Sequence, residues 1–348
     1  MGTKIKDIIT SEEITIDDLS GKTLAVDSFN RLYQFLTTIR QRDGSPLMDS
    51  RLRITSHLSG LFNRTIDLLE KDIKEIFVFD GKSPDLKKRE QQRRSKIKKE
   101  ADLKLMAARA QGNTEDMKKY AGRTARLTSE MIEESKALIK ALGLPVVQAP
   151  AEGEAQASEI VRAKKAYAVA SEDFDSLIFG APILIKNLSI SGKKKKTKTL
   201  GFITIKPERI ILSDILYKNS IDQDQLIAIA MLVGTDFNIG GIPQIGIKKA
   251  QNLIKKFGKD FDSMFKECRW NDYFDYSWNE VFNLIKNMPK QKEFDLKFTA
   301  PNIDEIKNIL VKNHNFNEER IDSKLSRLLK IKRKKNKEKS QSSLSKWF

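Results

Sequence analysis

Short apolar runs alternate with longer amphipathic segments in the first half of the chain. The short runs lie at 22–27, 75–80, 146–150 and 166–173. Between them, residues 54–69 and 128–142 carry apolar side chains at helical spacing, and Gly143 and Pro145 end the second helix. Buried strands that alternate with amphipathic helices predict an α/β fold, in which helices flank a mostly parallel central sheet.

From about residue 221 onward the pattern is helical. Residues 226–233 are apolar throughout, and the basic segment 248–258 follows the spacing of one helix face. Further helical segments continue to about residue 327. No internal repeat at solenoid periods is present, and the length suits one large domain or two medium ones.

Lysine and arginine gather in three runs. In the first, 87–99, Ile97 is the only sizeable apolar residue, so a helix there is polar all round and cannot pack on a core. It must stand away from the body or become ordered against a negatively charged partner. The second run, 193–196, is predicted to be the tip of a β-hairpin. The third lies in 331–348, which is predicted to be a flexible basic tail.

The composition indicates the kind of partner and excludes several kinds of site. The chain has 348 residues, 64 Lys and Arg against 47 Asp and Glu, and a net charge of +17, which favours a polyanionic partner. The single cysteine, Cys268, excludes an internal disulfide and a zinc finger, and two histidines, His57 and His314, disfavour a His-ligated metal. Without an apolar run of about 18 residues or a signal peptide, an intracellular protein is expected.

Carboxylates follow the predicted strands and begin the predicted helices at five separate places. The seven acids are Asp27, Asp80, Glu152, Glu154, Asp173, Asp175 and Asp236. Each one alone fits helix capping or turn formation. However, the carboxyl ends of parallel strands form one edge of a sheet, where ligands bind. Most of the seven acids should therefore converge there.

Seven converging carboxylates need positive charge, because two like charges 4 Å apart repel by about 4 kcal/mol at an effective dielectric near 20. Oxygen ligands without His or Cys suit Mg²⁺ or Mn²⁺ rather than zinc. Lys87, Gln91 and Arg94 share one helix face, and the two cations among them could meet a phosphate. This charge balance is that of a two-metal phosphodiesterase.

Two other phosphate chemistries fit less well. A Walker A loop almost begins at Gly241, but Ile247 stands where its lysine is required. A haloacid-type phosphatase needs a second aspartate two residues after Asp27, where Phe29 stands. Residues 240–254 are typical of a glycine hairpin that opens a basic helix, whose free N–H groups can bind a DNA phosphate. A plain helix–turn–helix connection fits them equally well.

Five stretches, taken in order, resemble the flap endonucleases of the structure-specific 5′ nuclease superfamily. They are AVDSFNRLYQFL, VFDGKSPDLKKRE, APAEGEAQA, SEDFDSLIFGAP and GTDFNIGGIPQIGIKKA. The resemblance, which runs from Gly2 to about residue 330, implies a single nuclease domain over 1–330. Its parts would be an N-terminal nuclease region (1–105), a helical arch (84–130), an internal nuclease region (120–260), a helix–two-turn–helix motif (223–257) and a helical C-terminal part (261–330).

The resemblance also implies the roles of the site residues. Asp27, Asp80, Glu152 and Glu154 match acids near a first metal ion, and Asp173, Asp175 and Asp236 match acids near a second. Lys87 and Arg94 match the arch pair that contacts the scissile phosphate. The implied cofactor is a pair of Mg²⁺ ions, for which Mn²⁺ can substitute.

Further residues match the DNA-binding positions of the family. Tyr33 matches an aromatic residue on which a nucleobase stacks, although ordinary core packing explains it equally well. The remaining matches, beside Glu152 and Asp236, are Gly234, Gly240, Gly246, Lys248 and Lys249. The last four belong to the helix–two-turn–helix motif, which often binds K⁺ and would hold downstream duplex.

Two departures from the family pattern stand out. The family often has glycine where this chain has Leu52, in a segment associated with the 3′-flap pocket. The opening GTKIKDII also differs from the commoner start, which leaves the role of the Gly2 amine near the metals open.

The last eight residues, 341–348, resemble the peptide by which replication proteins bind the sliding clamp, the proliferating cell nuclear antigen. Leu344, Trp347 and Phe348 can form an apolar plug on one helical turn, and Gln341 can anchor it by hydrogen bonds. A Trp-Phe pair at the end of a polar tail has no core to join, which favours this interpretation.

The sequence thus predicts a Mg²⁺-dependent endonuclease for DNA replication and base excision repair. It would cleave branched DNA near the base of a 5′ flap, would also have 5′–3′ exonuclease activity, and would be a monomer apart from the clamp. The alternatives are a related 5′ exonuclease or junction resolvase, a catalytically silent DNA- and clamp-binding adaptor, and an RNA-directed nuclease. The short tail favours an archaeal cytoplasm, while a nuclear setting stays open.

Overall fold

The computed structural model describes residues 3, 5–188, 192–195 and 202–344. Within these residues a seven-stranded sheet has the order β1-β9-β6-β5-β2-β3-β4. Its strands are β1 (Glu12–Glu13), β2 (Thr23–Asp27), β3 (Lys74–Phe79), β4 (Val146–Gln148), β5 (Ala168–Ala170), β6 (Ile183–Lys186) and β9 (Glu208–Ile211). The five strands from β2 to β6 are parallel, and β1 and β9 join antiparallel at one edge. The predicted α/β class with a mostly parallel sheet is confirmed.

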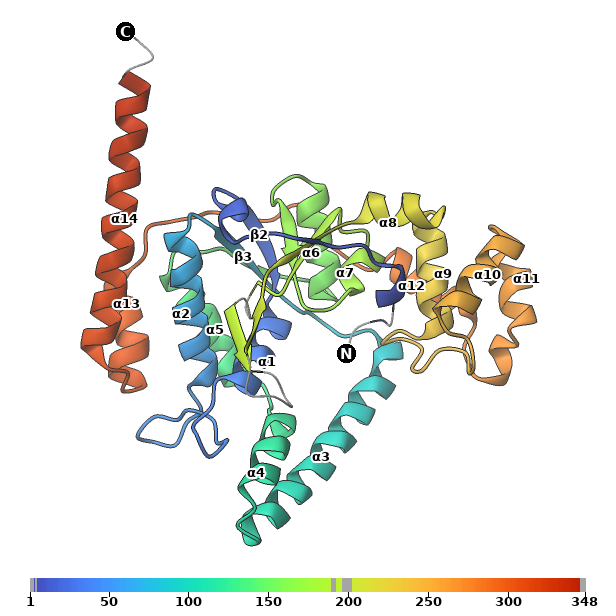
Figure 1. Cartoon of the computed structure of the whole chain (residues 1–348), viewed down its shortest axis with the longest axis horizontal. Coiled ribbons are helices and arrows are strands. Elements are labelled where there is room, and N and C mark those ends of the chain that lie inside the picture. The colour runs from blue at the N-terminus through green and yellow to red at the C-terminus, as the bar shows by residue number, and fades with distance from the viewer. Residues whose placement is uncertain (1–2, 4, 189–191, 196–201, 345–348) are drawn as a thin grey trace.

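Alternate residues of each central strand face two separate cores, one on each side of the sheet. Leu24 and Val26 of β2 pack with α1 (Ser28–Thr38), α2 (Ser56–Glu70) and α5 (Ser129–Ala141), whereas Ala25 packs on the opposite side. That second core includes α6 (Gly153–Arg162), α7 (Asp175–Ile178) and α8 (Leu212–Asn219). Figure 1 shows helices on both sides of the strands.

Strand order reverses beside β2, and this places the site. The chain runs from β2 through β3 to β4 in one direction, and then returns to place β5 on the other side of β2. In an open parallel sheet, ligands bind outside the carboxyl ends of the strands at such a reversal. The carboxyl ends of β2 and β5 are therefore the expected centre of a site.

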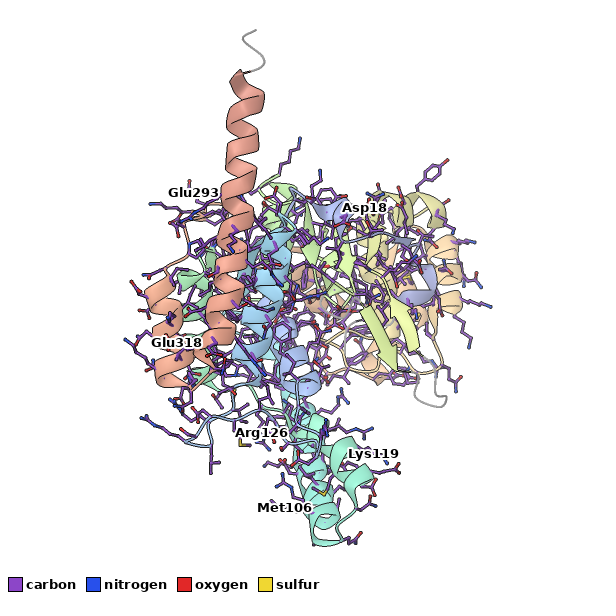
Figure 2. The ribbon with its side chains drawn as sticks, turned by 60° about the vertical axis from the view of Figure 1, so that its left-hand side comes forward. Asp18, Met106, Lys119, Arg126, Glu293 and Glu318 are labelled. Carbon is purple, nitrogen blue, oxygen red and sulfur yellow. The ribbon has the colours of Figure 1, made fainter. Side chains whose placement is uncertain are left out.

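The first basic run forms helix α3 (Lys88–Ala110), which with α4 (Thr114–Ala121) stands out from the body (Figure 1). Ala101, Leu105 and Ala108 are buried, and the two helices pack closely on each other. Met106 is 65% exposed, and Figure 2 shows it at the far end of the projection. A helix that is polar on most sides cannot lie on a core, which explains why this pair stands away.

The chain after β9 is helical, as predicted. After α8, its α-helices are α9 (Gln223–Val233), α10 (Ile247–Phe257), α11 (Phe261–Glu267), α12 (Trp278–Lys286), α13 (Ile303–Lys307) and α14 (Glu318–Leu344). Helix α9 is buried along most of its length, and Asp222 and Gln225 form a capping box at its start. Its far end leads directly into the segment that carries Asp236.

Two predictions about the basic runs are wrong. Residues 331–344 are not a flexible tail but continue α14, because no Gly or Pro interrupts 318–344 and the buried Ile321, Leu325 and Leu328 anchor its first turns. Once nucleated, a helix extends at little cost. Gln341 and Leu344 lie in its last turn; Trp347 and Phe348 lie outside the described residues.

The second run is not simply a hairpin tip. Lys193, Lys194 and Lys195 lie within β7 (Gly192–Lys195), which pairs antiparallel with β8 (Phe202–Ile205) in a sheet of its own. The predicted turn, including Lys196, lies outside the described residues. The preceding strand, β6, pairs instead with β9, because Ile210 of β9 is buried in the main core.

Candidate active site

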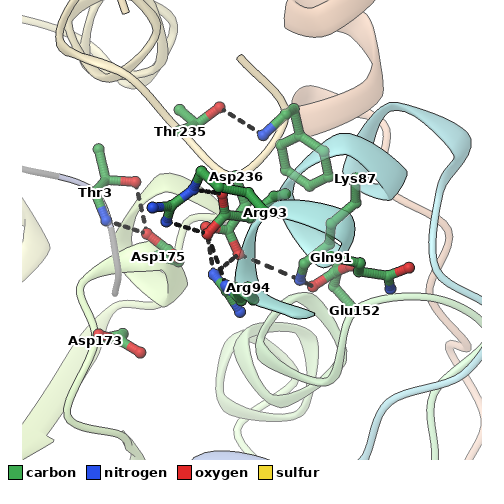
Figure 3. A network of polar contacts seen from close by, with 12 residues as sticks. Thr3, Lys87, Gln91, Arg93, Arg94, Glu152, Asp173, Asp175, Thr235 and Asp236 are labelled. Atoms are coloured by element: carbon green, nitrogen blue, oxygen red, sulfur yellow. Dashed lines mark hydrogen bonds and ion pairs between the residues drawn. The ribbon is translucent and has the colours of Figure 1, made fainter. Parts of the chain in front are cut away.

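All seven predicted acids line one cavity of about 700 Å³ at the carboxyl edge of the sheet, together with Lys87, Arg94 and Tyr33. They come from the ends of β2, β3 and β5, from the start of α6 and from the segment after α9. Residues as far apart in the chain as Asp27 and Asp236 thus face the same space. Part of this arrangement is drawn in Figure 3.

Backbone N–H groups position two of the acids. Asp27 ends β2 and caps α1, and its Oδ1 accepts a hydrogen bond from the Asn30 N–H at 3.1 Å. Asp80 follows β3, and its Oδ1 accepts from the Gly153 N–H at the start of α6 at 2.6 Å. A Cβ on Gly153 would lie 2.6 Å from that oxygen, so glycine allows the approach. The hydrogen bonds from the N–H groups at the helix starts therefore also hold these two acids in the site.

Side chains position three other acids. The Ser171 hydroxyl donates to Glu154 Oε1 at 3.0 Å, and the Asn30 side chain donates to Asp173 Oδ2 at 2.9 Å. Thr3 donates to Asp175 Oδ1 twice, from its N–H at 2.8 Å and from its hydroxyl at 2.6 Å. Sequence reasoning missed all three donors. Only Asn30 carried a signal, since it stands three residues after a helix-capping aspartate.

Lys87 and Arg94 reach the acids from the base of the projecting helices. The Lys87 ammonium bonds Glu152 and lies 3.5 Å from Asp236 Oδ2. Arg94 Nη2 lies 2.8 Å from both oxygens of Asp236, and its Nε donates to Glu90 Oε1 at 2.7 Å. Glu90 is only 3% exposed and also binds Arg93 through two hydrogen bonds (Figure 3 draws the arginines). No pattern in the sequence pointed to this buried glutamate.

Burial and mutual repulsion act on the carboxyl groups. Burial, with Asp80 and Asp173 nearby, raises the pKa of Asp27 to about 8. Burial also raises the pKa of Asp80 and Glu152, and burial with Asp175 and Asp27 nearby raises that of Glu154 well above its ordinary value. Perturbed acids in a cavity are typical of a functional site that gains positive charge when a ligand binds.

The charge of Lys87 fits the same picture. Burial lowers the pKa of its ammonium, but the carboxylates of Glu152 and Asp236 outweigh this and raise it. The lysine therefore stays protonated and compensates part of the negative charge.

The donors fit hard divalent cations. They are carboxylate oxygens from several elements, gathered in a buried, negatively charged cavity. Within the described ranges, however, no three Asp, Glu, His or Cys side chains already stand close enough together to enclose an ion. Lys87 bonds Glu152 and Asp236, and Arg94 bonds Asp236, so protein cations already pair with two of the seven acids.

Tyr33 lies in the cavity wall rather than in the core. It is half-buried, and the Lys98 ammonium lies 4.7 Å from its ring centre. Lys98 continues the α3 face of Gln91 and Arg94, and Arg123 and Arg126 line the same cavity. Sequence reasoning did not single out these three cations. They lie close together because α4 returns along α3 and brings the segment with Arg123 and Arg126 to the cavity.

The glycine hairpin predicted before α10 is present but does not line the cavity. Gly234, Gly240 and Gly241 have positive φ angles, and Gly246 caps α10. Lys248 and Lys249 are exposed in the first turn of α10. Of the residues in this region, Asp236 faces the acids, so the structure separates two surfaces: an acidic cavity and an exposed basic helix start.

Leu52 has φ of 60° and is 78% exposed. This left-handed conformation favours glycine, which agrees with the residue common in the family at this position.

Among the described helices, none is long and apolar enough to cross a membrane.

Comparison with known proteins gives a consistent result. The model of the XPG N-terminal domain matches residues 3–101, and that of the XPG I-region matches 143–236. Flap endonuclease 1 of Thermococcus onnurineus is 45% identical over 348 residues, covering 100% of this chain and 99% of its own. The solved flap endonuclease-1 of Methanococcus jannaschii has a TM-score of 0.74 and 37% identity, with 96% and 100% of the two chains covered.

The catalytic core of Rad2, solved in complex with a DNA substrate, shares the fold. Its TM-score is 0.68 at 23% identity, and the match covers 94% of this chain and 100% of that one. Near-complete coverage at 45% identity establishes more than a fold. The chain belongs to the flap endonuclease 1 family, and it is therefore a structure-specific nuclease of the hydrolase class.

Proposed function

We propose that this nuclease cleaves branched DNA at one phosphodiester near the base of a 5′ flap, using two Mg²⁺ ions, for which Mn²⁺ can substitute. The observation that supports this most strongly is the single cavity shared by seven carboxylates and two arch cations, Lys87 and Arg94. An acidic cavity alone would repel DNA, so cations must complete it before a phosphate can enter.

Asp27, Asp80, Glu152 and Glu154 would hold one ion, and Asp173, Asp175 and Asp236 the other. When bound, such a pair supplies a hydroxide nucleophile and stabilises the in-line transition state. Asn30, Ser171 and the Gly153 N–H orient the carboxylates before the substrate arrives. Preorganisation of this kind leaves little rearrangement for the reaction itself.

Lys87 and Arg94 would bind the scissile phosphate. Both now bond Glu152 or Asp236, so arrival of DNA would exchange these carboxylates for phosphate oxygens, and the proposed metal ions would then neutralise the two acids. Lys98, Arg123 and Arg126 line the same cavity and would neutralise the phosphates of the 5′ strand, while Tyr33 offers a ring on which a base can stack.

The duplex downstream of the cut would bind the second surface. The N–H groups near Gly240 and Gly246 and the exposed Lys248 and Lys249 suit phosphate contacts that carry no sequence information. A K⁺ ion at the helix–two-turn–helix would support this contact. Binding should weaken by roughly 0.9 log units per log unit of salt for each phosphate that is neutralised.

The sliding clamp is the proposed protein partner, through Gln341, Leu344, Trp347 and Phe348. The end of α14 lies far from the sheet in Figure 1, so a clamp bound there would not block the acidic cavity.

The test is cleavage of an end-labelled double-flap DNA with Mg²⁺, comparing the natural chain with Asp175→Ala. A discrete cut at the flap base, lost in the variant while DNA binding persists, would support the proposal. Cutting inward from a free 5′ end alone, or symmetric cutting of a four-way junction, would favour the exonuclease or resolvase alternative. Binding of DNA and clamp without cleavage would favour the adaptor, and preference for RNA flaps the RNA-directed nuclease.

A further inference from the structure

The N-terminal segment closes one side of the acidic cavity. Thr3 is 5% exposed and shares a small extension of the cavity with Glu152, Glu154, Asp175 and Asp236. Its two hydrogen bonds to Asp175 join positions 172 residues apart in the chain. Figure 3 shows Thr3 pointing at Asp175 from the side opposite Arg94.

The segment that presents Thr3 is anchored independently of this contact. Ile5 and Ile8 are buried in the core that contains α6 and α9. The Ile8 carbonyl accepts a hydrogen bond from the Asn219 side chain of α8 at 3.1 Å. Because these contacts hold the backbone, the Thr3 hydroxyl can be removed without releasing the segment.

Both donors of Thr3 act on the same oxygen. Asp175 Oδ1 accepts the N–H at 2.8 Å and the hydroxyl at 2.6 Å, whereas Oδ2 accepts no hydrogen bond in the part of the chain that the structure describes. An oxygen that already accepts two hydrogen bonds has little capacity left for a cation. The arrangement therefore offers Asp175 as a ligand through Oδ2 alone.

One-oxygen and two-oxygen carboxylate ligands suit different ions. Ca²⁺ takes six to eight oxygens in flexible geometry and often binds both oxygens of one carboxylate. Mg²⁺ requires a near-ideal octahedron, in which a bidentate carboxylate fits poorly, and Mn²⁺ occupies similar oxygen sites. Outer partners that orient a ligand in this way influence which metal is bound and how tightly.

We propose that Thr3 is a positioning residue that restricts Asp175 to one ligating oxygen, and so favours Mg²⁺ or Mn²⁺ over Ca²⁺. The inference rests on the proposed function, since it takes Asp175 as a metal ligand. It adds a determinant of metal choice that lies outside the acids themselves, in a segment whose sequence carries no metal-binding pattern.

The experiment measures metal preference without DNA or turnover. The full chain is loaded with Mn²⁺ and titrated with Ca²⁺, and the free Mn²⁺ is followed by its electron paramagnetic resonance signal. Thr3→Val removes the hydroxyl at nearly constant volume and keeps the N–H bond. We expect it to shift the ratio of the two dissociation constants towards Ca²⁺ by about tenfold.

Two controls separate this role from folding. Thr3→Ser keeps a hydroxyl and should restore the natural ratio. Thr10→Val removes a buried hydroxyl that makes no hydrogen bond among the described residues of the same N-terminal segment, and should also leave the ratio unchanged. Thermal unfolding of all three variants verifies that the fold persists.

The outcomes distinguish the two proposals. A natural chain that binds Mn²⁺ and cleaves flaps, with Thr3→Val showing the same ratio, would overturn the inference and leave the proposed function intact. The inference also falls if Thr3→Ser behaves like Thr3→Val. If the natural chain neither binds Mn²⁺ nor cleaves, the proposed function fails, and this inference fails with it.

Discussion

Two groups of acids share the cavity but are held differently. Asp27 and Asp80, of the group proposed for the first ion, accept hydrogen bonds from backbone N–H groups at helix starts. Asp173, Asp175 and Asp236, proposed for the second, accept hydrogen bonds from the side chains of Asn30, Thr3 and Arg94, and Asp175 accepts one more from the Thr3 N–H.

The difference determines how firmly the carboxylates of each group are held in position. The backbone donors to Asp27 and Asp80 are fixed by the sheet and the helices beside it, so these two acids are built into the fold. The side-chain donors to the second group come from α1, from the N-terminal segment and from α3, which also carries proposed phosphate contacts. The second group should therefore be the one that responds to the arch and to substitution, and breaking individual supports tests this.

The largest expected loss of cleavage rate comes from Gly153→Ala, which disturbs Asp80, one of the two acids held by backbone N–H groups. The new Cβ would lie 2.6 Å from Asp80 Oδ1, so this carboxylate must rotate away and lose its N–H donor. The obstructing atom is the end of a flexible side chain, and the unfolding temperature should change little. A ligand displaced by about 1 Å costs about 100-fold in cleavage rate. Single-turnover cleavage of a double flap measures it, and unchanged cleavage would show that the Gly153 contact is dispensable.

The second effect concerns the stability of metal-free protein. The folded chain holds a proton on Asp27 up to a pKa of about 8, whereas the unfolded chain releases it near the ordinary value. The unfolding free energy should therefore fall as pH rises between about 4 and 8. Asp27→Asn removes the part of this loss that Asp27 causes, and in the presence of a chelator at pH 9 it should raise the unfolding free energy by about 2 kcal/mol or more.

Urea denaturation at pH 5 and pH 9 measures this effect. Asp214→Asn, an exposed acid of α8, is the control and should leave the pH dependence unchanged. If the unfolding free energy of the natural chain does not fall between the two pH values, the pKa of Asp27 is not raised in the folded protein.

The comparison also marks what the sequence could and could not predict. Most of the seven acids were predictable because strands that end in aspartate must bring those ends to one edge of a parallel sheet, whereas Asp236 follows a helix, α9. Their supports were not: Thr3 meets Asp175 across 172 residues, and no local pattern specifies such a contact. Polarity on all sides correctly predicted that α3 stands away. The same reasoning failed for 331–344, where an anchored helix simply continues beyond its last buried residue.

The third effect tests the link between α3 and the second group. Glu90→Gln weakens the buried anchor of Arg94, so the guanidinium should hold Asp236 and an incoming phosphate less firmly. Charged hydrogen bonds of this kind contribute about 1.5–3 kcal/mol, and part of this persists with glutamine, so cleavage should fall about tenfold. Glu100→Gln, an exposed acid on the same helix, is the control. Equal losses in both variants would point to general arch charge rather than to the anchor.

The smallest effect is expected from Asn30→Ala. Asn30 contacts both groups, because its N–H bonds Asp27 and its side chain bonds Asp173. The Asn30 N–H still donates to Asp27 in the variant, whereas the side-chain bond to Asp173 is lost. A single hydrogen bond from an amide contributes about 1 kcal/mol, so cleavage should fall about fivefold at limiting Mg²⁺ and less at saturating Mg²⁺. Asn283→Ala, an exposed amide on α12, controls for loss of a helical asparagine. If the defect were instead independent of Mg²⁺, Asn30 would act on Asp27 or on the fold, and the division between a backbone-held and a side-chain-held group would not hold at this residue.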